Sequence, residues 1–263
     1  MLKSFVLYGI YIAALLISAL VPSLSWLAPV AMLVLLAGAL WLWRSAGHPL
    51  RTLGFGRDVS WLRFLIYGLL LGLMLPLAAI AVQAAADWLA LEPTTLSTAE
   101  LIRRLLLGVV KMFFVVAFEE VVFRGYYLQR MRARLSIWSA VLVSALLWAL
   151  SHVPDMIVSG LSAPQLVLGV LTFILWGSVL GIGFLYTSKT LWFPFGLHYG
   201  NNLGFSLLGT LMTKMYLAPA WLVGHPAWAP ESGLIGAALW AVCLLAAWQI
   251  ARHKMEPNGA QVA

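Results

Sequence analysis

Three clusters of polar residues interrupt the apolar runs of this sequence, and their side chains are of the kinds that acid–base catalysis uses. The clusters are Glu119, Glu120 and Arg124; then His152; then His198 and Asn202. A carboxylate of raised basicity in an apolar site is a suitable general base for a water molecule. Ionisable side chains inside apolar helices are costly and mark functional sites by default. We therefore expect these clusters to meet in one hydrolytic site.

Helical spacing indicates which of these side chains share a face. Glu120 and Arg124 are four residues apart and can form an ion pair, which gives both a structural role as support for the site. Glu119 is rotated by about 100° from Glu120 and is free to face another helix. His198 and Asn202 are also four apart and present an imidazole and an amide on one surface.

Two kinds of chemistry fit these groups. In the first, Glu119 activates water together with His152, while His198 and Asn202 donate hydrogen bonds to the oxyanion formed when water attacks an amide carbonyl. In the second, Glu119, His152 and His198 supply one oxygen and two nitrogen ligands to a catalytic divalent metal such as zinc. The residue spacing leaves both open.

The composition places these clusters in a membrane protein. Hydrophobic residues make up 63% of the 263 residues and charged residues only 10%, whereas a soluble domain carries about 25% charge. Thirteen Trp residues and a net charge of +7 fit interfacial aromatic belts and basic cytoplasmic loops. The basic residues are scattered and form no dense patch, so no nucleic-acid partner is expected. The single cysteine, Cys243, excludes an internal disulfide.

The chain is predicted to be an all-α polytopic membrane protein with about eight transmembrane helices. Eight apolar runs approach the roughly 20 residues of a bilayer span, at 4–21, 25–43, 62–85, 104–127, 138–161, 165–186, 190–212 and 233–251. The first run lacks a small-residue cleavage site, so we expect a retained helix. Gly68-x-x-x-Gly72 is expected to be a helix-packing face. Only the tail from Glu256 to Ala263 is predicted to be disordered.

The fourth and fifth spans predict that Glu119 and His152 lie at the same depth. If the two helices turn near Leu135 and Ser136, Glu119 is 16 residues before the turn and His152 is 16 residues after it. His198 is nine residues beyond Lys189, or about 14 Å along a helix. We therefore expect the three side chains to meet in a polar cavity in the inner half of the membrane, within reach of cytoplasmic water.

The distribution of Lys and Arg predicts the orientation. With eight spans and the N-terminus in the cytoplasm, four basic residues lie outside: Arg103, Arg104, Lys111 and Lys214. The other twelve lie inside: Lys3, Arg44, Arg51, Arg57, Arg63, Arg124, Arg130, Arg132, Arg134, Lys189, Arg252 and Lys254. This positive-inside asymmetry predicts that both termini are cytoplasmic. The expected location is a cell membrane, with a bacterial cytoplasmic membrane favoured.

The three clusters resemble the motifs of the CAAX-protease and bacteriocin-processing (CPBP, or Abi) intramembrane proteases, which include the type II CAAX prenyl endopeptidases. The family pattern EExxxR, FxxxH and HxxxN corresponds here to Glu119-Glu120…Arg124, Trp148…His152 and His198…Asn202. Trp148 replaces the usual Phe. The resemblance implies an endopeptidase site that opens to the cytoplasm, in a family usually classed as metalloproteases although a metal-free glutamate mechanism has been argued.

The resemblance divides the chain into three parts. We expect N-terminal helices and their loops at 1–99, a protease core at 100–212, and an outer loop, last span and cytoplasmic tail at 213–263. The expected partners are the lipid bilayer and a peptide or membrane-associated protein. Nothing in the sequence recognises a prenyl group, and the oligomeric state is left open.

Two other functions compete with proteolysis. A non-enzymatic immunity or scaffold protein would keep the fold, and its phenotype would survive loss of Glu119 or His198. A small-solute or proton transporter would use buried Glu and His as a proton relay, and such folds often show internal repeats. The sequence shows no such repeat.

Overall fold

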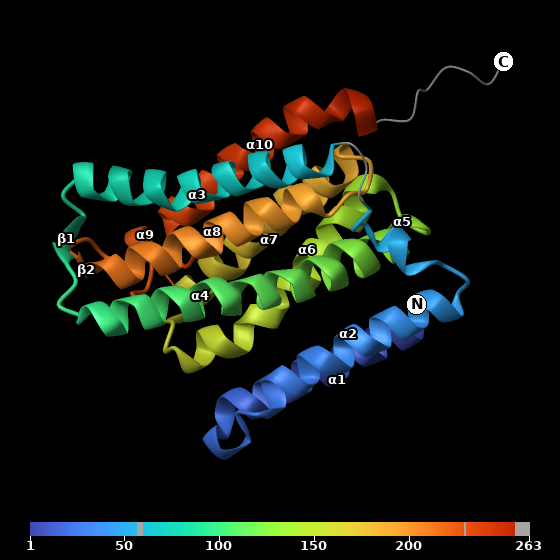
Figure 1. The fold of residues 1–263 in the computed structure, drawn as a ribbon, viewed down its shortest axis with the longest axis horizontal. Coiled ribbons are helices and arrows are strands. Elements are labelled where there is room, and N and C mark those ends of the chain that lie inside the picture. Colours follow the sequence, from blue (N-terminus) through green and yellow to red (C-terminus); the bar gives the residue numbers. More distant parts are fainter. Residues whose placement is uncertain (57–59, 229, 256–263) are drawn as a thin grey trace.

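The chain folds almost entirely into helices, as expected of an all-α membrane protein (Figure 1). The computed structural model describes residues 1–56, 60–228 and 230–255; the expected disorder of Glu256–Ala263 lies outside this range. The long helices are α1 (Leu2–Leu20), α2 (Leu27–Ser45), α3 (Trp61–Ala85), α4 (Thr98–Glu119), α6 (Ile137–Val158), α7 (Ala163–Tyr186), α8 (Trp192–Leu211) and α10 (Leu234–Met255). Shorter elements are η1 (Pro22–Leu24), η2 (Leu50–Leu53), α5 (Gln129–Arg132) and α9 (Ala220–Val223).

Six of the described helices are long and apolar enough to cross a membrane: α1, α2, α3, α6, α7 and the Leu234–Arg252 part of α10. They coincide with six of the eight expected spans. The other two expected spans form α4 and α8, which do not meet the same criterion of length and apolar composition. These two helices carry three residues of the polar clusters, Glu119, His198 and Asn202. The chain is a multi-pass membrane protein.

Helix α4 continues without a break into a π-helix, η3 (Glu120–Leu128). Ser97 caps the start of α4 by accepting a hydrogen bond from the backbone N–H of Glu100, at 3.3 Å. The change from α to π geometry falls between the two adjacent glutamates, Glu119 and Glu120. Such π segments inside helices often occur at functional sites. After α5 the chain turns and enters α6 at Ile137, where the sequence predicted the turn.

Glycines bring α3 and α8 into close contact, which confirms the predicted packing face. A Cβ atom at Gly68 would overlap the backbone carbonyl of Phe193, and one at Gly72 would overlap that of Leu197. Gly196 on α8 makes the reciprocal approach to the backbone of α3. Small residues let the two backbones approach closely. This contact fixes the part of α8 that carries His198.

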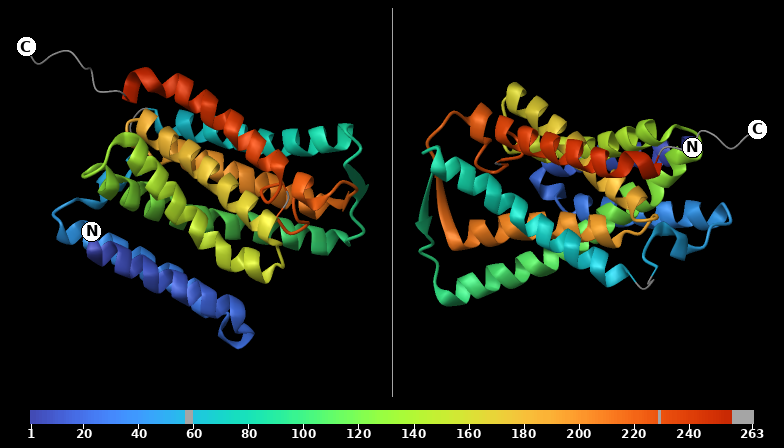
Figure 2. Two further views of the ribbon diagram at one scale, coloured as in Figure 1. Left: turned by 180° about the vertical axis from the view of Figure 1, so that it is seen from behind. Right: turned by 90° about the horizontal axis from the view of Figure 1, so that it is seen from above.

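The bundle has two distinct ends (Figures 1 and 2). The first, here called the arginine-rich end, holds the N-terminus, the end of α2, α5, the turn at Lys189 and the end of α10. The second, here called the hairpin end, carries α9 and two antiparallel strands, β1 (Leu89–Pro93) and β2 (Met212–Tyr216). The sequence did not predict this small sheet. Its strands join distant parts of the chain, with Leu91 opposite Lys214.

Helices α1 and α2 pack together and rest against α6 and η3. Tyrosines anchor this contact, because the hydroxyl of Tyr127 donates to the backbone carbonyl of Ser4 at 2.7 Å. The Ser4 hydroxyl also lies 2.8 Å from that of Tyr126. Both tyrosines are fully buried. These contacts therefore hold η3, the helical segment that begins at Glu120, against α1.

Candidate active site

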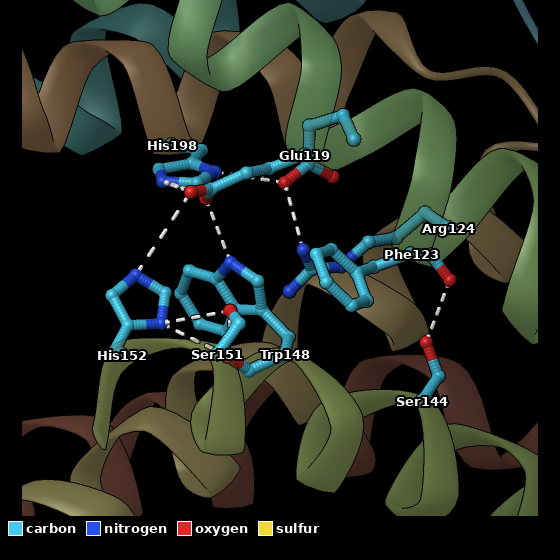
Figure 3. Close-up of polar contacts among 9 residues, drawn as sticks. Glu119, Phe123, Arg124, Ser144, Trp148, Ser151, His152 and His198 are labelled. Atoms are coloured by element: carbon cyan, nitrogen blue, oxygen red, sulfur yellow. Dashed lines mark hydrogen bonds and ion pairs between the residues drawn. The ribbon is translucent and has the colours of Figure 1, made fainter. Parts of the chain in front are cut away.

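The carboxylate of Glu119 is the meeting point of three side chains from two neighbouring helices (Figure 3). The indole N–H of Trp148 on α6 donates a hydrogen bond to Oε2 of Glu119 at 2.7 Å. The Nε2 atom of His152, also on α6, lies 3.9 Å from Oε1. The Nε2 atom of His198 on α8 lies 3.6 Å from Oε2. The expected meeting of Glu119, His152 and His198 is therefore present.

Glu120 holds the other side of the His198 ring. Its Oε1 atom lies 2.8 Å from Nδ1 of His198 and accepts a hydrogen bond from Arg124 Nη1 at 3.0 Å. The Arg124 and Glu120 side chains are 1% and 0% exposed. The predicted Glu120–Arg124 pair is thus present, but Glu120 also contacts His198, which the sequence did not predict. A carboxylate can only accept, so Nδ1 donates and Nε2 is the nitrogen that faces Glu119.

His152 is oriented by its own helix and by α7. Its Nδ1 atom lies 2.9 Å from the backbone carbonyl of Trp148, which can only accept a hydrogen bond. Its ring stacks on Phe173 with the centroids 4.2 Å apart. These contacts direct Nε2 of His152 toward Glu119. The side chain is 18% exposed, more than those of Glu119 and His198.

The buried charges of this cluster nearly cancel. Two carboxylates, Glu119 and Glu120, face one guanidinium, Arg124. The Arg124 guanidinium also lies over the Trp148 ring, 4.5 Å from its centroid. The guanidinium therefore offsets part of the cost of burying the two carboxylates.

A cavity of about 500 Å³ reaches these side chains. Glu119, His152, His198 and Asn202 all line it, so the four predicted catalytic residues share one space. None of the described residues makes a hydrogen bond to the Asn202 side chain, which leaves its amide free to bind a ligand in the cavity. The cavity also extends to Lys214 on β2 and to Glu231 in the loop before α10.

The cavity runs toward the hairpin end, where its lining residues on α4, α6 and α8 lead. The sequence predicted a polar cavity in the inner half of the membrane, within reach of cytoplasmic water. The depth of the three residues along their helices did not predict the direction in which the cavity runs. Side chains of η3, such as Phe123 and Tyr127, are completely buried and fill the space toward the arginine-rich end.

The far end of the cavity carries charged groups of both signs. Burial raises the pKa of Glu231 to about 7, and the positive charge of Lys214 acts in the opposite direction. Burial lowers the pKa of Lys214. Trp228 lies near His152, with ring centroids 6.2 Å apart, and its indole N–H donates to the Ser159 hydroxyl at 3.0 Å. The loop that carries Trp228 and Glu231 thus forms one wall of the approach to the site.

The possible metal set, Glu119, His152 and His198, has suitable ligand types but does not surround a metal position. Within residues 1–56, 60–228 and 230–255, no group of three His, Cys, Asp or Glu side chains is arranged to hold a metal ion. The Trp148 N–H already occupies Oε2 of Glu119, the oxygen nearer to His198. A zinc ligand normally lies about 2.0–2.2 Å from the ion on an open lone pair. The arrangement of these three side chains favours the metal-free alternative.

Trp148 is the functional contact that the sequence interpretation missed. The sequence analysis placed Trp148 where the family usually has Phe and gave it no role in the site. In the structure the indole N–H provides the only short hydrogen bond that the Glu119 carboxylate receives from a described side chain, and Phe has no such donor. Trp148 and His152 are four residues apart in the sequence. This spacing places both side chains on one face of α6, the face that contacts Glu119.

Trp148→Phe should lower peptide cleavage without unfolding the protein. A hydrogen bond to a charged group contributes about 1.5–3 kcal/mol, so we expect kcat to fall about 10- to 100-fold. KM should change little because the ring remains. The matched control is Trp176→Phe. Trp176 packs against His198 with centroids 5.0 Å apart, but its buried Nε1 bonds to none of the described residues. Equal losses in both variants would contradict a positioning role for Trp148.

The comparison with known proteins agrees with this site. Residues 101–204 match the family model described as type II CAAX prenyl endopeptidase Rce1-like. No curated protein matches the chain. The matched segment includes all three polar clusters, from Glu119 to Asn202. Over residues 101–204, the chain is therefore similar to the Rce1-like type II CAAX prenyl endopeptidases, which are proteases.

Proposed function

We propose that this protein is an intramembrane endopeptidase that hydrolyses a peptide bond with water activated by Glu119. The observation that carries the proposal is the convergence of two imidazoles and an indole N–H on one carboxylate at the inner end of a cavity. The substrate is a peptide or a segment of a membrane-associated protein. The match of residues 101–204 to a protease family supports the same conclusion.

In the first step Glu119 removes a proton from a water molecule in the cavity, and the water oxygen bonds to the carbonyl carbon of the substrate. His152 shares the proton through Nε2, which lies 3.9 Å from Oε1 of Glu119. The negative charge moves to the carbonyl oxygen. Asn202 donates a hydrogen bond to that oxygen from its side-chain amide. His198 donates from Nε2 in its doubly protonated form, in which Nδ1–H remains bonded to Glu120.

In the second step the C–N bond breaks and the leaving nitrogen takes a proton from Glu119 or His152. The products are a carboxylic acid and an amine, and the catalytic groups return to their initial protonation. Glu120 and Arg124 support this cycle through His198, because Glu120 fixes Nδ1 and leaves Nε2 toward the reacting groups. The buried aromatic residues of η3 keep the Glu120–Arg124 ion pair away from water.

The proposal is tested with purified protein in liposomes and a mixed peptide library, with mass spectrometry as the readout. An endopeptidase yields complementary pairs of fragments. A scaffold or immunity protein leaves the library intact, and a transporter moves solute in a flux assay without cutting peptide. The substrate's prenylation is tested in the same assay by comparing a peptide with and without a prenyl group on its cysteine.

Metal removal provides a separate prediction. Because Glu119, His152 and His198 do not surround a metal position, we expect dialysis against a strong chelator to leave cleavage unchanged. Metal analysis of the active protein should find no stoichiometric zinc. Loss of activity on chelation, with recovery on adding zinc alone, would overturn the metal-free mechanism and support the zinc alternative.

A further inference from the structure

Within the described helix α1, only three side chains are buried, and all three are polar. They are Ser4, Tyr8 and Tyr11, which are 1%, 7% and 6% exposed. Their spacing of four and three residues places them on one face of the helix. Apolar side chains of α1 such as Leu2 and Ile10 are instead more than half exposed. Hydrogen bonds from polar side chains join helices inside a membrane, so this face docks α1 onto the bundle.

Tyr8 binds α6 at the peptide group that immediately precedes Trp148. Its hydroxyl donates a hydrogen bond to the backbone carbonyl of Leu147, and the Leu147 carbonyl carbon is joined to the backbone nitrogen of Trp148. The indole N–H of Trp148 in turn donates to the carboxylate of Glu119 at 2.7 Å. The Tyr8 hydroxyl therefore holds the stretch of backbone from which the hydrogen-bond donor to Glu119 extends.

Tyr11 lies between the two helices that carry Glu119 and His152. On one side, the centroid of its ring is 6.1 Å from that of Phe118, the residue before Glu119 on α4. On the other side, its side chain contacts that of Ser151, the residue before His152 on α6. Tyr11 therefore touches the immediate neighbours of two catalytic residues, one on each helix, and links the positions of these helices.

Ser151 belongs to the same hydrogen-bonded turn of α6 as Trp148 and His152 (Figure 3). Its hydroxyl donates to the backbone carbonyl of Trp148 at 2.6 Å and lies 3.4 Å from Nδ1 of His152. The same carbonyl lies 2.9 Å from that Nδ1 atom. None of the described residues of α1 lines the catalytic cavity, so α1 holds this turn from outside the cavity.

We propose that Tyr8 and Tyr11 are positioning residues for the reaction, through which α1 holds Trp148 and His152 against Glu119. The two tyrosines act through the α6 turn and touch neither the substrate nor the attacking water. Helix α1 lies outside residues 101–204, the segment that matches a protease family. The inference rests on the proposed function, because it gives these tyrosines a part in the chemistry at Glu119.

Tyr8→Phe keeps the ring and removes the hydroxyl that binds the Leu147 carbonyl. We expect kcat to fall about 2- to 10-fold, the effect of losing one neutral hydrogen bond. KM should stay unchanged because Tyr8 does not line the cavity. In a Trp148→Phe background most of this loss should disappear, because Tyr8 acts by placing the Trp148 N–H. An unchanged kcat in Tyr8→Phe, or losses that multiply fully in the double variant, would overturn the inference.

Tyr127→Phe is the matched control. It removes a hydrogen bond of the same kind, from a buried tyrosine to a backbone carbonyl, but one that joins η3 to Ser4 rather than α1 to α6. Any loss of kcat that it causes should multiply fully with that of Trp148→Phe. Thermal unfolding of each variant shows whether the compared proteins are folded.

Hydrogen–deuterium exchange tests the positioning without any cleavage assay. We expect the backbone amides at 148–152 to exchange about 2- to 10-fold faster in Tyr8→Phe and in Tyr11→Phe than in the wild type, because this turn opens more often. Tyr127→Phe should leave their exchange unchanged. If exchange changes as expected but the wild type cuts no peptide, positioning by α1 stands and the proposed function fails. If peptide is cut but neither Tyr8→Phe nor Tyr11→Phe alters exchange, the proposed function stands and the inference fails.

Discussion

Glu119→Gln should reduce peptide cleavage about 10²- to 10⁴-fold, the usual contribution of a general base. Glutamine keeps the size of the side chain, and its amide oxygen can still accept the Trp148 N–H that lies 2.7 Å from Oε2. It cannot remove a proton from water. The fold should therefore persist while the reaction stops, which is measured by cleavage rate and by thermal unfolding of the same preparation.

Glu100→Gln is the matched control for this substitution. Glu100 lies on the same helix, and its hydrogen bonds with Arg103 and Arg104 hold the pKa of its carboxyl at about 2. It is far from the cavity lining. The control should cleave peptide at the wild-type rate. Undiminished cleavage by Glu119→Gln would remove Glu119 from the mechanism, whatever the control shows.

Arg124→Met should destabilise the protein by about 3–5 kcal/mol, the cost of leaving a buried charge without its partner. The Arg124 side chain is 1% exposed and pairs at 3.0 Å with Glu120, which is 0% exposed. Methionine fills the space but leaves the Glu120 carboxylate unpaired. The measurement is the free energy of unfolding in a defined detergent. Arg103→Met, which breaks an exposed pair, should leave the free energy of unfolding nearly unchanged.

The double variant Glu120→Gln with Arg124→Met separates charge from packing. A neutral glutamine can still accept the His198 Nδ1–H at the position of Oε1, and no buried charge remains. Most of the stability lost in Arg124→Met should therefore return. If the double variant is as unstable as Arg124→Met, the guanidinium acts through packing rather than through its charge.

The polar clusters could be predicted from the sequence because charged residues are rare in membrane-spanning segments. In a chain with 10% charged residues, Glu119, Glu120 and Arg124 stand out inside an apolar helix. The equal spacing of Glu119 and His152 from the turn then predicted their contact, which the structure places at 3.9 Å. Helical periodicity also predicted the Glu120–Arg124 pair.

Contacts that depend on side-chain direction could not be predicted in the same way. Glu120 was expected to pair with Arg124 as support for the site, and only Glu119 was expected to face another helix. Both carboxylates nevertheless reach His198, because they approach the two different nitrogens of one ring. The strands β1 and β2 were missed because their pairing joins residues more than 100 positions apart, such as Leu91 and Lys214.

The direction of the cavity depended on packing that the sequence pattern does not contain. Counting residues along the helices correctly predicted that the catalytic residues lie close together. It did not show which side of these residues is filled by other side chains and which side is open. The buried aromatic residues of η3, including Tyr127, close one side. The loop with Glu231 leaves the other side lined by polar groups.

Cleavage of a peptide library in H₂¹⁸O by wild type and by Glu119→Gln tests the central claim most directly. We expect paired fragments from the wild type, with one ¹⁸O atom in each new C-terminal carboxylate, because the attacking oxygen comes from water. We expect almost no fragments from Glu119→Gln. An intact library with the wild-type protein, or equal cleavage by both proteins, would contradict the assignment of proteolysis to Glu119.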